Sequence, residues 1–241
     1  MRNNKSIINV YKKNNIKSGV VTQLLYGENF KKIKEKNSWI KIKNDTDNYK
    51  GYIIKKKFPL KHKNTHKIDT LYANLYFKPN NKSKIKKKLS FGSRIKVINS
   101  KGPFYKFDNL WIKKNNLKKI NYKRKNIFQN VKIFINKKYK WGGKNYNGID
   151  CSALVQLFLN FNNMFCPRDT RDQIKYFKKK VKIKNIKEKD LIFWKGHIAI
   201  VISKKKLIHA YGPKKKVIIM DIKQTISLIR KTAKLEVIGT K

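Results

Sequence analysis

A single cysteine, Cys151, directly follows a loop rich in glycine over residues 142–148 and precedes a strongly apolar run. Unpaired backbone N–H groups and the dipole at the start of a helix favour negative charge, so a cysteine placed there is expected to have a lowered pKa. Cysteine is also among the most buried residue types, which makes a structural cysteine the alternative interpretation. The polar neighbours Asp150 and Ser152 favour a nucleophile.

Two histidines follow the cysteine, and both open or lie within apolar runs that are typical of strands. His197 comes directly after Gly196, and His209 lies in the next run. We expect His197 to take the thiol proton as a general base and His209 to orient it through a hydrogen bond. A histidine satisfied within the core is the alternative for each. The chain order of cysteine, histidine and a second polar residue is that of a papain-like thiol hydrolase.

The remaining cysteine and the metal interpretation are weaker. Cys166 lies in an apolar stretch before Pro167 and is expected to be structural. A cysteine with two histidines also suggests zinc, but zinc ligands usually occur as closely spaced pairs, and His62 and His66 have no cysteine nearby. We therefore expect neither a metal nor a cofactor.

The elements that must position these residues are helices followed by an antiparallel sheet, which is an α+β arrangement. Apolar spacing predicts helices over 126–136, 151–163 and 172–177. The helix that begins at Cys151 has little polar face and is expected at the centre of its domain. The expected strands are 190–194, 197–202, 206–210, 217–220 and 235–239.

The first half of the chain contains an internal repeat. Residues 24–33 align with 89–98, and the aromatic–glycine step of each copy falls at the same offset. Short alternating strands between turns are typical of small β-barrels, and the pattern resembles bacterial SH3-like modules. Coincidence within a biased composition is the alternative. The predicted domains are two SH3-like β-barrels and a catalytic domain, at 1–58, 59–120 and 121–241.

The net charge of +49 suggests a nucleic-acid partner, but its distribution argues against one. Lysine is spread along the whole chain and arginine is scarce, whereas proteins that read bases use arginine and local basic stripes. The joint excess of Lys, Asn and Ile favours a nucleotide-composition bias, with no specific nucleic-acid partner. No apolar run has the length of a signal peptide or a membrane span, so we expect a soluble, cytoplasmic protein with no membrane partner.

Six motifs over residues 125–240 together resemble the NlpC/P60 family of cell-wall cysteine peptidases. They are Tyr139-Lys-Trp-Gly-Gly143, Asp150-Cys-Ser-Ala-Leu-Val-Gln156, Pro167-Arg-Asp-Thr-Arg-Asp-Gln173, Lys189-Asp-Leu-Ile-Phe-Trp194, Gly196-His-Ile-Ala-Ile200 and Leu207-Ile-His-Ala210. The resemblance implies a papain-like catalytic domain behind the SH3-like modules. It also implies Cys151 as nucleophile, His197 as base and His209 as orienter.

The same resemblance implies a set of substrate-binding residues. Tyr139 would lie near the oxyanion and Trp141 would form a wall of the cleft. An acidic group would bind a free α-ammonium through a charge-assisted bond. The residues implied at the amino end of the substrate are Asp150, Ser152, Asp169 and Thr170, with Glu28 and Tyr49 from the first SH3-like module. Ala153 departs from the glycine that is usual after the cysteine–serine pair.

The implied activity is hydrolysis of the γ-D-glutamyl–diamino-acid bond in murein peptides with a free N-terminal L-Ala, within cell-wall peptide recycling. An exported enzyme that remodels peptidoglycan and an amidase or acyltransferase on the same scaffold are the alternatives. A catalytically inactive binding module is disfavoured because Cys151, His197 and His209 are all present. The sequence leaves the oligomeric state open.

Overall fold

The computed structural model describes all residues from 1 to 241, and the chain divides into two compact units. Unit 1 comprises residues 1–122 together with 144–146, and unit 2 comprises residues 123–143 and 147–241. The short segment 144–146, which contains strand β14 (Lys144–Asn145), is therefore part of unit 1 although both its neighbours along the chain belong to unit 2.

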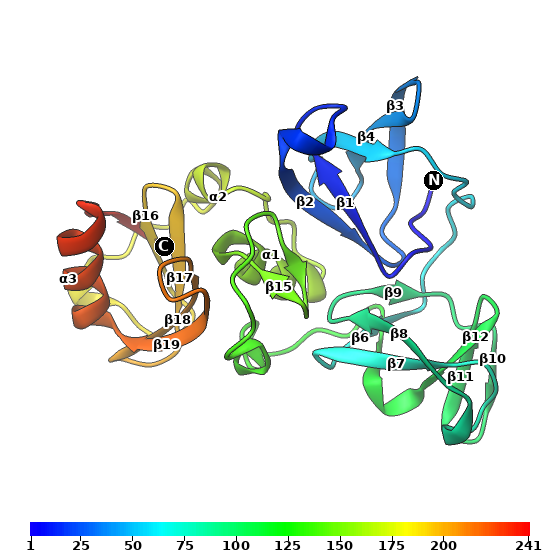
Figure 1. Cartoon of the computed structure of the whole chain (residues 1–241). Coiled ribbons are helices and arrows are strands. Elements are labelled where there is room, and N and C mark those ends of the chain that lie inside the picture. Colours follow the sequence, from blue (N-terminus) through cyan, green and yellow to red (C-terminus); the bar gives the residue numbers. More distant parts are fainter. The chain divides into compact units, whose positions relative to one another are not determined.

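The first SH3-like module is a five-stranded antiparallel sheet in the order β2-β1-β5-β4-β3 (Figure 1). Its core positions alternate along the strands, as in β4, where Ile40 and Ile42 are buried. The strands are β1 (Ile7–Tyr11), β2 (Val20–Leu25), β3 (Phe30–Lys36), β4 (Trp39–Asn44) and β5 (Lys50–Ile54).

The second module has a five-stranded sheet in the order β10-β11-β12-β7-β8 and a three-stranded sheet in the order β13-β6-β9. Its strands are β6 (His66–Ile68), β7 (Tyr72–Tyr76), β8 (Lys84–Ser90), β9 (Arg94–Ile95), β10 (Asn99–Lys101), β11 (Phe104–Phe107), β12 (Leu110–Lys113) and β13 (Leu117–Lys119). Read from β8, the larger sheet has the same strand order as the first module, with β7 in the place of β1. The sheets are open, so the expected closed barrels are corrected to SH3-like sheets.

The internal repeat extends to local backbone detail. Gly27 and Gly92, which follow the aromatic residues of the repeat, both have φ +80°, a conformation that glycine adopts without steric cost. Two short 3₁₀ helices, Ile16–Ser18 and Asn81–Ser83, each begin after an asparagine whose side chain accepts a backbone N–H bond. Coincidence does not account for agreement at this level.

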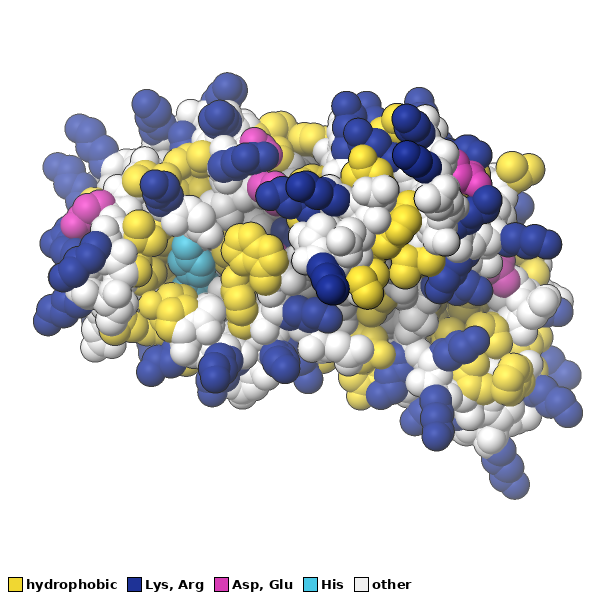
Figure 2. Space-filling view, turned by 45° about the horizontal axis from the view of Figure 1, so that its top comes forward, with side chains coloured by type: hydrophobic (Ala, Val, Ile, Leu, Met, Phe, Trp, Pro, Cys, Tyr) yellow, Lys and Arg dark blue, Asp and Glu magenta, His cyan; other side chains and the backbone are white.

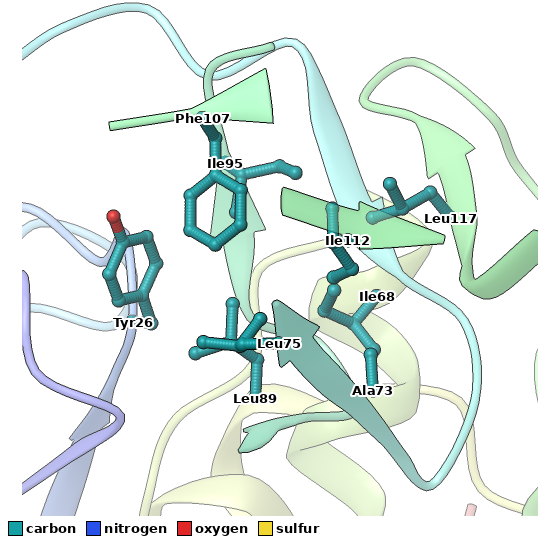
Figure 3. Close-up of a cluster of buried hydrophobic side chains, with 9 residues drawn as sticks. All are labelled: Tyr26, Ile68, Ala73, Leu75, Leu89, Ile95, Phe107, Ile112 and Leu117. Atoms are coloured by element: carbon teal, nitrogen blue, oxygen red, sulfur yellow. The ribbon is translucent and has the colours of Figure 1, made fainter. Parts of the chain in front are cut away.

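The two modules of unit 1 share a core. Tyr26 of the first module is buried in the apolar cluster of the second, with its ring edge-on to Phe107 at 5.5 Å (Figure 3). The Tyr26 hydroxyl donates to Asp108, which also pairs with Arg2 at 3.4 Å. The aromatic residue of the repeat therefore joins the two modules.

Unit 2 contains three α-helices and a five-stranded antiparallel sheet in the order β19-β18-β17-β16-β20 (Figure 1). The helices are α1 (Cys151–Phe161), α2 (Thr170–Tyr176) and α3 (Ile222–Ala233). The strands are β15 (Gly148–Ile149), β16 (Leu191–Trp194), β17 (His197–Val201), β18 (Lys206–Tyr211), β19 (Lys216–Asp221) and β20 (Val237–Thr240). Every residue of α1 is buried, as its apolar composition predicts.

The expected helix over 126–136 is wrong. This stretch forms successive turns and a 3₁₀ helix, Val131–Phe134, whose N–H groups reach back three residues rather than four. Phe128, Val131 and Phe134 are buried at a spacing of three, which suits this tighter winding. The Asn126 side chain also accepts the Phe128 N–H, a local bond that competes with α-helix formation.

Helix α3 was not predicted from the sequence. Asp221 caps it by accepting the Gln224 N–H, and Ile222, Thr225 and Ile229 form its buried face. No helix of the protein is long and apolar enough to span a membrane. Lysine and arginine side chains are scattered over the visible surface rather than gathered into one stripe (Figure 2).

Candidate active site

The Cys151 thiol lies at the first turn of α1, where the capping residue is Asp150. The Asp150 carboxylate accepts the Ala153 N–H at 2.8 Å, which begins the helix at the cysteine. Cys151 as a whole residue is 6% exposed, so protein covers nearly all of it. The local sequence thus places Cys151 at the helix start, as the glycine-rich loop and the following apolar run predict.

The sulfur of Cys151 lies beside both peptide neighbours of His197. It is 4.0 Å from the Gly196 carbonyl oxygen and accepts the Ile198 N–H. In the β17–β18 register, Ile200 pairs with Ile208 and Val201 with Leu207, so the Ile198 amide lies outside these pairs. The thiol and the imidazole-bearing residue are thereby brought to one place.

The two histidines form the hydrogen bond that the sequence predicts. His197 Nε2 lies 2.9 Å from His209 Nδ1, and the other nitrogen of His209 lies 3.4 Å from the Met220 sulfur. His209 is fully buried and its ring stacks on Tyr211 at 4.7 Å with the planes 7° apart. These contacts fix the orientation of the His209 ring, and the hydrogen bond in turn fixes the position of His197 Nε2.

Burial reverses the expected direction of the cysteine pKa. Removal from water, followed by the charge of Asp150, raises the pKa of Cys151 to about 11. The Ile198 N–H, the Thr170 hydroxyl and Arg168 act in the opposite direction. Burial also lowers the pKa of His197 to about 4, so burial disfavours the charged form of both side chains.

Asp150 and Ser152 belong to a buried network, not to an open pocket. Arg168 donates to both oxygens of Asp150, at 3.0 and 2.6 Å, and to the Ser152 hydroxyl at 2.8 Å. Backbone N–H groups of Gly142 and Ala153 fill further sites on the same carboxylate. Its oxygens are occupied by internal donors, so Asp150 positions the start of α1, and its expected contact with a substrate stays a prediction.

Arg168 and Gln173 are site residues that sequence reasoning missed. The buried Gln173 amide donates to the backbone oxygens of Ser152 and Pro167, and so ties α2 to the start of α1. The available signal was composition: the chain has only six arginines among its 62 cationic residues. An arginine in such a background marks a place where a planar fork is needed.

The other cysteine has no such surroundings. Cys166 is fully buried, with its sulfur 3.4 Å from the Pro167 carbonyl oxygen and 3.4 Å from the Gln173 amide nitrogen. Both cysteines are free thiols. Cys166 packs beneath the network that positions Cys151 and is a natural control for it.

The remaining residues that were assigned to the site in unit 2 have distinct environments. Burial and the negative charges of Cys151 and Asp150 raise the pKa of Tyr139, so its phenol stays a hydrogen-bond donor near the sulfur. Trp141 is 70% exposed and free to meet a ligand. Asp169 is half-buried at the start of α2, directly before Thr170, whose hydroxyl bonds to the Cys151 sulfur.

Glu28 and Tyr49 lie in unit 1. Glu28 is buried, with one carboxylate oxygen 2.7 Å from the Lys144 ammonium and the other accepting the Leu25 N–H at 2.8 Å. Lys144 has no exposed surface. The carboxylate that was expected to bind a substrate ammonium is thus already paired with an internal one. Tyr49 is half-buried after the turn that follows β4, and its role stays a prediction.

The structure gathers no group of three histidine, cysteine or acidic side chains that could hold a metal ion. A groove of about 850 Å³ in unit 2 is lined mainly by lysines and isoleucines, from Ile183 to the start of α3, and includes none of the residues assigned to the site. This groove is therefore separate from the residues around Cys151.

Comparison with known proteins gives two family matches. Residues 136–234 match the NlpC/P60 family, and residues 6–57 match the bacterial SH3 domain. A crystal structure of an NlpC/P60 family protein from Bacillus cereus superposes with a TM-score of 0.82 over 100% of this chain and 98% of that one, at 18% identity. At that identity, the likeness shows the fold alone.

Two curated relatives match over parts of their length. Dipeptidyl-peptidase 6 of Lysinibacillus sphaericus is 33% identical over 87 residues, which are 36% of this chain and 32% of that protein. A probable endopeptidase NlpC homolog of Haemophilus influenzae is 30% identical over 82 residues, which are 32% of this chain and 43% of that protein. These matches place an NlpC/P60 domain at residues 136–234, around the site, and a bacterial SH3 domain at residues 6–57 of the chain.

Proposed function

We propose that the protein is a cysteine endopeptidase that hydrolyses the γ-D-glutamyl–diamino-acid bond of murein peptides with a free N-terminal L-Ala. The observation that carries the proposal is the Cys151 thiol at the start of α1, beside Gly196 and Ile198, with His197 bonded to His209. The name of one relative, dipeptidyl-peptidase 6, describes release of dipeptides and supports the free amino terminus.

Acylation begins from the neutral site. As the Cys151 sulfur attacks the scissile carbonyl carbon, His197 takes the thiol proton, so the charge pair forms only when the new bond forms. The Tyr139 phenol is a suitable donor to the resulting oxyanion because its high pKa keeps it protonated. Collapse breaks the C–N bond, His197 returns the proton to the departing amine, and a thioester remains.

Deacylation uses the same groups. Water attacks the thioester carbonyl while His197 accepts one of its protons, and collapse expels the Cys151 sulfur, which recovers the proton from His197. The Ile198 N–H and the Thr170 hydroxyl donate to the sulfur and stabilise the thiolate as it leaves. The products are an acid and an amine, and no redox partner or metal takes part in any step.

The decisive experiment is cleavage of L-Ala-γ-D-Glu-diaminopimelate followed by mass spectrometry, with the wild type, Cys151→Ala and Cys166→Ala. We expect release of the dipeptide L-Ala-D-Glu by the wild type and by Cys166→Ala, and none by Cys151→Ala. Cleavage that survives in Cys151→Ala would contradict the nucleophile. Failure of the wild type to cleave would contradict the substrate and favour transfer to an acceptor amine, the acyltransferase alternative.

The free amino terminus needs its own test, because Asp150 and Glu28 are both paired internally. Cleavage of the same peptide with an N-acetyl group is expected to be slower through a higher KM. Equal rates on the two peptides would remove the requirement for an ammonium. Asp169→Asn, which changes the remaining acidic residue assigned to the substrate, is expected to narrow the difference between them.

We also propose that the substrate pool is recycled wall peptide in the cytoplasm rather than intact wall. The small size of the proposed substrate supports this, since a free N-terminal L-Ala exists only after the peptide has left the glycan. Fractionation of cells tests it: activity on the tripeptide should be found in the soluble fraction. Activity confined to the wall fraction would favour the exported, remodelling alternative.

A further inference from the structure

We infer that Met220 is a positioning residue of this site, whose acceptor-only thioether selects the ring tautomers of His209 and His197. The inference rests on the proposed function, since it concerns the base of that reaction. It begins from the contact of His209 Nε2 with the Met220 sulfur at 3.4 Å, which no step of the mechanism uses.

The strand register explains how Met220 reaches the histidines. Val201 faces Leu207 across β17 and β18, and Leu207 faces Met220 across β18 and β19, so these three share a face. Side chains alternate along a strand, which places His197 and His209 on that same face. Met220 is the diagonal neighbour of His209, within reach of a long side chain.

The bonding capacity of each group then orders the chain of hydrogen bonds. A thioether has lone pairs and no hydrogen, so His209 Nε2 must carry the hydrogen that points at it. In a neutral imidazole the other nitrogen is bare, so His209 Nδ1 accepts. His197 must therefore donate from Nε2 across the 2.9 Å contact, and its Nδ1 keeps a lone pair.

That lone pair is what a general base requires. With a donor in place of Met220, His209 would accept at Nε2 and donate from Nδ1, and His197 Nε2 would accept. His197 Nδ1 would then carry the hydrogen and could not take the thiol proton. Burial keeps both rings neutral, because it lowers the pKa of His197 to about 4 and that of His209 to about 3.

Three side chains contact the His209 ring, each from a different strand. His197 approaches from β17, Tyr211 stacks on its face from β18, and Met220 approaches from β19. The stacked tyrosine holds the ring plane at 7° to its own. A half-turn of the ring about its Cβ–Cγ bond would put carbon atoms in place of both nitrogens and break both edge contacts.

The first test is a direct observation of the wild-type tautomers by two-bond ¹⁵N–¹H correlation near neutral pH. The chain has four histidines, and His62→Gln and His66→Gln identify the two that belong to unit 1. We expect the remaining two rings both to carry hydrogen on Nε2. A ring of the pair with its hydrogen on Nδ1 would overturn the inference, whether or not the peptide substrate is cleaved.

The second test uses two substitutions with opposite bonding capacity. Met220→Leu removes the acceptor at similar volume and is expected to lower kcat about threefold to tenfold, with KM little changed. Met220→Lys presents only donors and is expected to lower kcat about 100-fold and to move hydrogen to Nδ1 of His209. Met164→Leu, the same change at a 44% exposed methionine, is the matched control.

A Met220→Lys variant that keeps the wild-type tautomers and kcat within about twofold would overturn the inference. So would a loss of kcat in Met220→Leu that is matched by Met164→Leu. Failure of the proposed function is distinct, because it would abolish cleavage in the wild type while leaving the tautomer measurement intact.

Discussion

Two buried ion pairs, one in each unit, hold the carboxylates that were expected to bind substrate. In unit 2, Asp150 pairs with Arg168 at 2.6 Å, and in unit 1, Glu28 pairs with Lys144 at 2.7 Å. All four side chains are at least nine-tenths buried. Asp150 directly precedes Cys151, and Glu28 directly follows Gly27 of the repeat. Each carboxylate is nevertheless paired with a cation of the chain itself.

The pairs differ in what the cation fixes. Arg168 bonds both oxygens of Asp150 and the Ser152 hydroxyl, and so sets the orientation of the carboxylate that caps α1. Lys144 meets a single oxygen of Glu28 as a compact charge. The arginine pair therefore aligns the backbone on both sides of Cys151, whereas the lysine pair neutralises a buried charge.

The largest effect is expected when the arginine pair is broken. Arg168→Met leaves the Asp150 charge buried and should lower the free energy of unfolding of unit 2 by about 5 kcal/mol. It should also raise the Cys151 pKa further, because Arg168 opposes that rise in the native protein. Calorimetry with hydrogen exchange at the α1 amides measures the first effect, and thiol alkylation against pH the second.

Arg171→Met is the matched control for this prediction. Arg171 lies three residues along the same segment, has 81% of its side chain exposed and meets only Asp172 at 3.8 Å. Its substitution should change stability by less than about 0.5 kcal/mol. Equal losses of stability in the two variants would show that the network around Asp150 contributes no more to stability than an exposed arginine does.

A smaller loss is expected when the lysine pair is broken. Lys144→Met should destabilise unit 1 by about 3 kcal/mol, at the low end for a buried pair, because Glu28 loses one bond and keeps the one from the Leu25 N–H. Faster hydrogen exchange at the Leu25 amide, which donates to Glu28, is the local readout. Lys86→Met, at an exposed strand position, is the control. Equal losses of stability in Lys144→Met and Lys86→Met would refute the prediction.

The two units should also respond differently to acid. The folded pKa values of His197 and His209, about 4 and about 3, lie below the unfolded value near 6.5, so the unfolded chain binds more protons between them. Stability is therefore unaffected above about pH 6.5 and falls as the pH is lowered through that window, by up to about 1.4 kcal/mol per pH unit for each proton. Separate unfolding of the units, followed by hydrogen exchange, measures it.

Unit 1 provides the internal comparison, since partial burial also lowers the pKa values of His62 and His66. Because these rings are less buried, unit 1 should lose less stability over the same window. In His209→Phe, the free energy of unfolding of unit 2 should depend less strongly on pH. An unchanged pH dependence in that variant would show that other groups cause it.

Local patterns explain why much of the fold was predictable. The strands of unit 2 follow from uninterrupted apolar runs, and the position of Cys151 follows from a capping residue between glycines and an apolar helix. The repeat of unit 1 was visible because aromatic–glycine steps recur at one offset. The missed α3 and the wrong helix over 126–136 show the limit: apolar spacings of three and four are hard to separate by eye.

The ion pairs were not predictable in the same way. Arg168 is 18 residues from Asp150 and Lys144 is 116 from Glu28, so only the folded chain brings them together. Lysine gives little information here because it occurs throughout the sequence. Arginine gives more: three of the six, Arg2, Arg124 and Arg168, are at most 6% exposed.

The smallest effect is expected when both members of the lysine pair are replaced together. Glu28→Leu with Lys144→Met should lie within about 1 kcal/mol of the wild type, since a buried pair often equals an apolar pair of similar volume. The corresponding double change, Asp150→Asn with Arg168→Met, should not recover in this way, because Asp150 also caps α1 and holds the Gly142 N–H. Double-mutant cycles on the two pairs measure the difference. Equal recovery in both would mean that Arg168, like Lys144, only neutralises a charge.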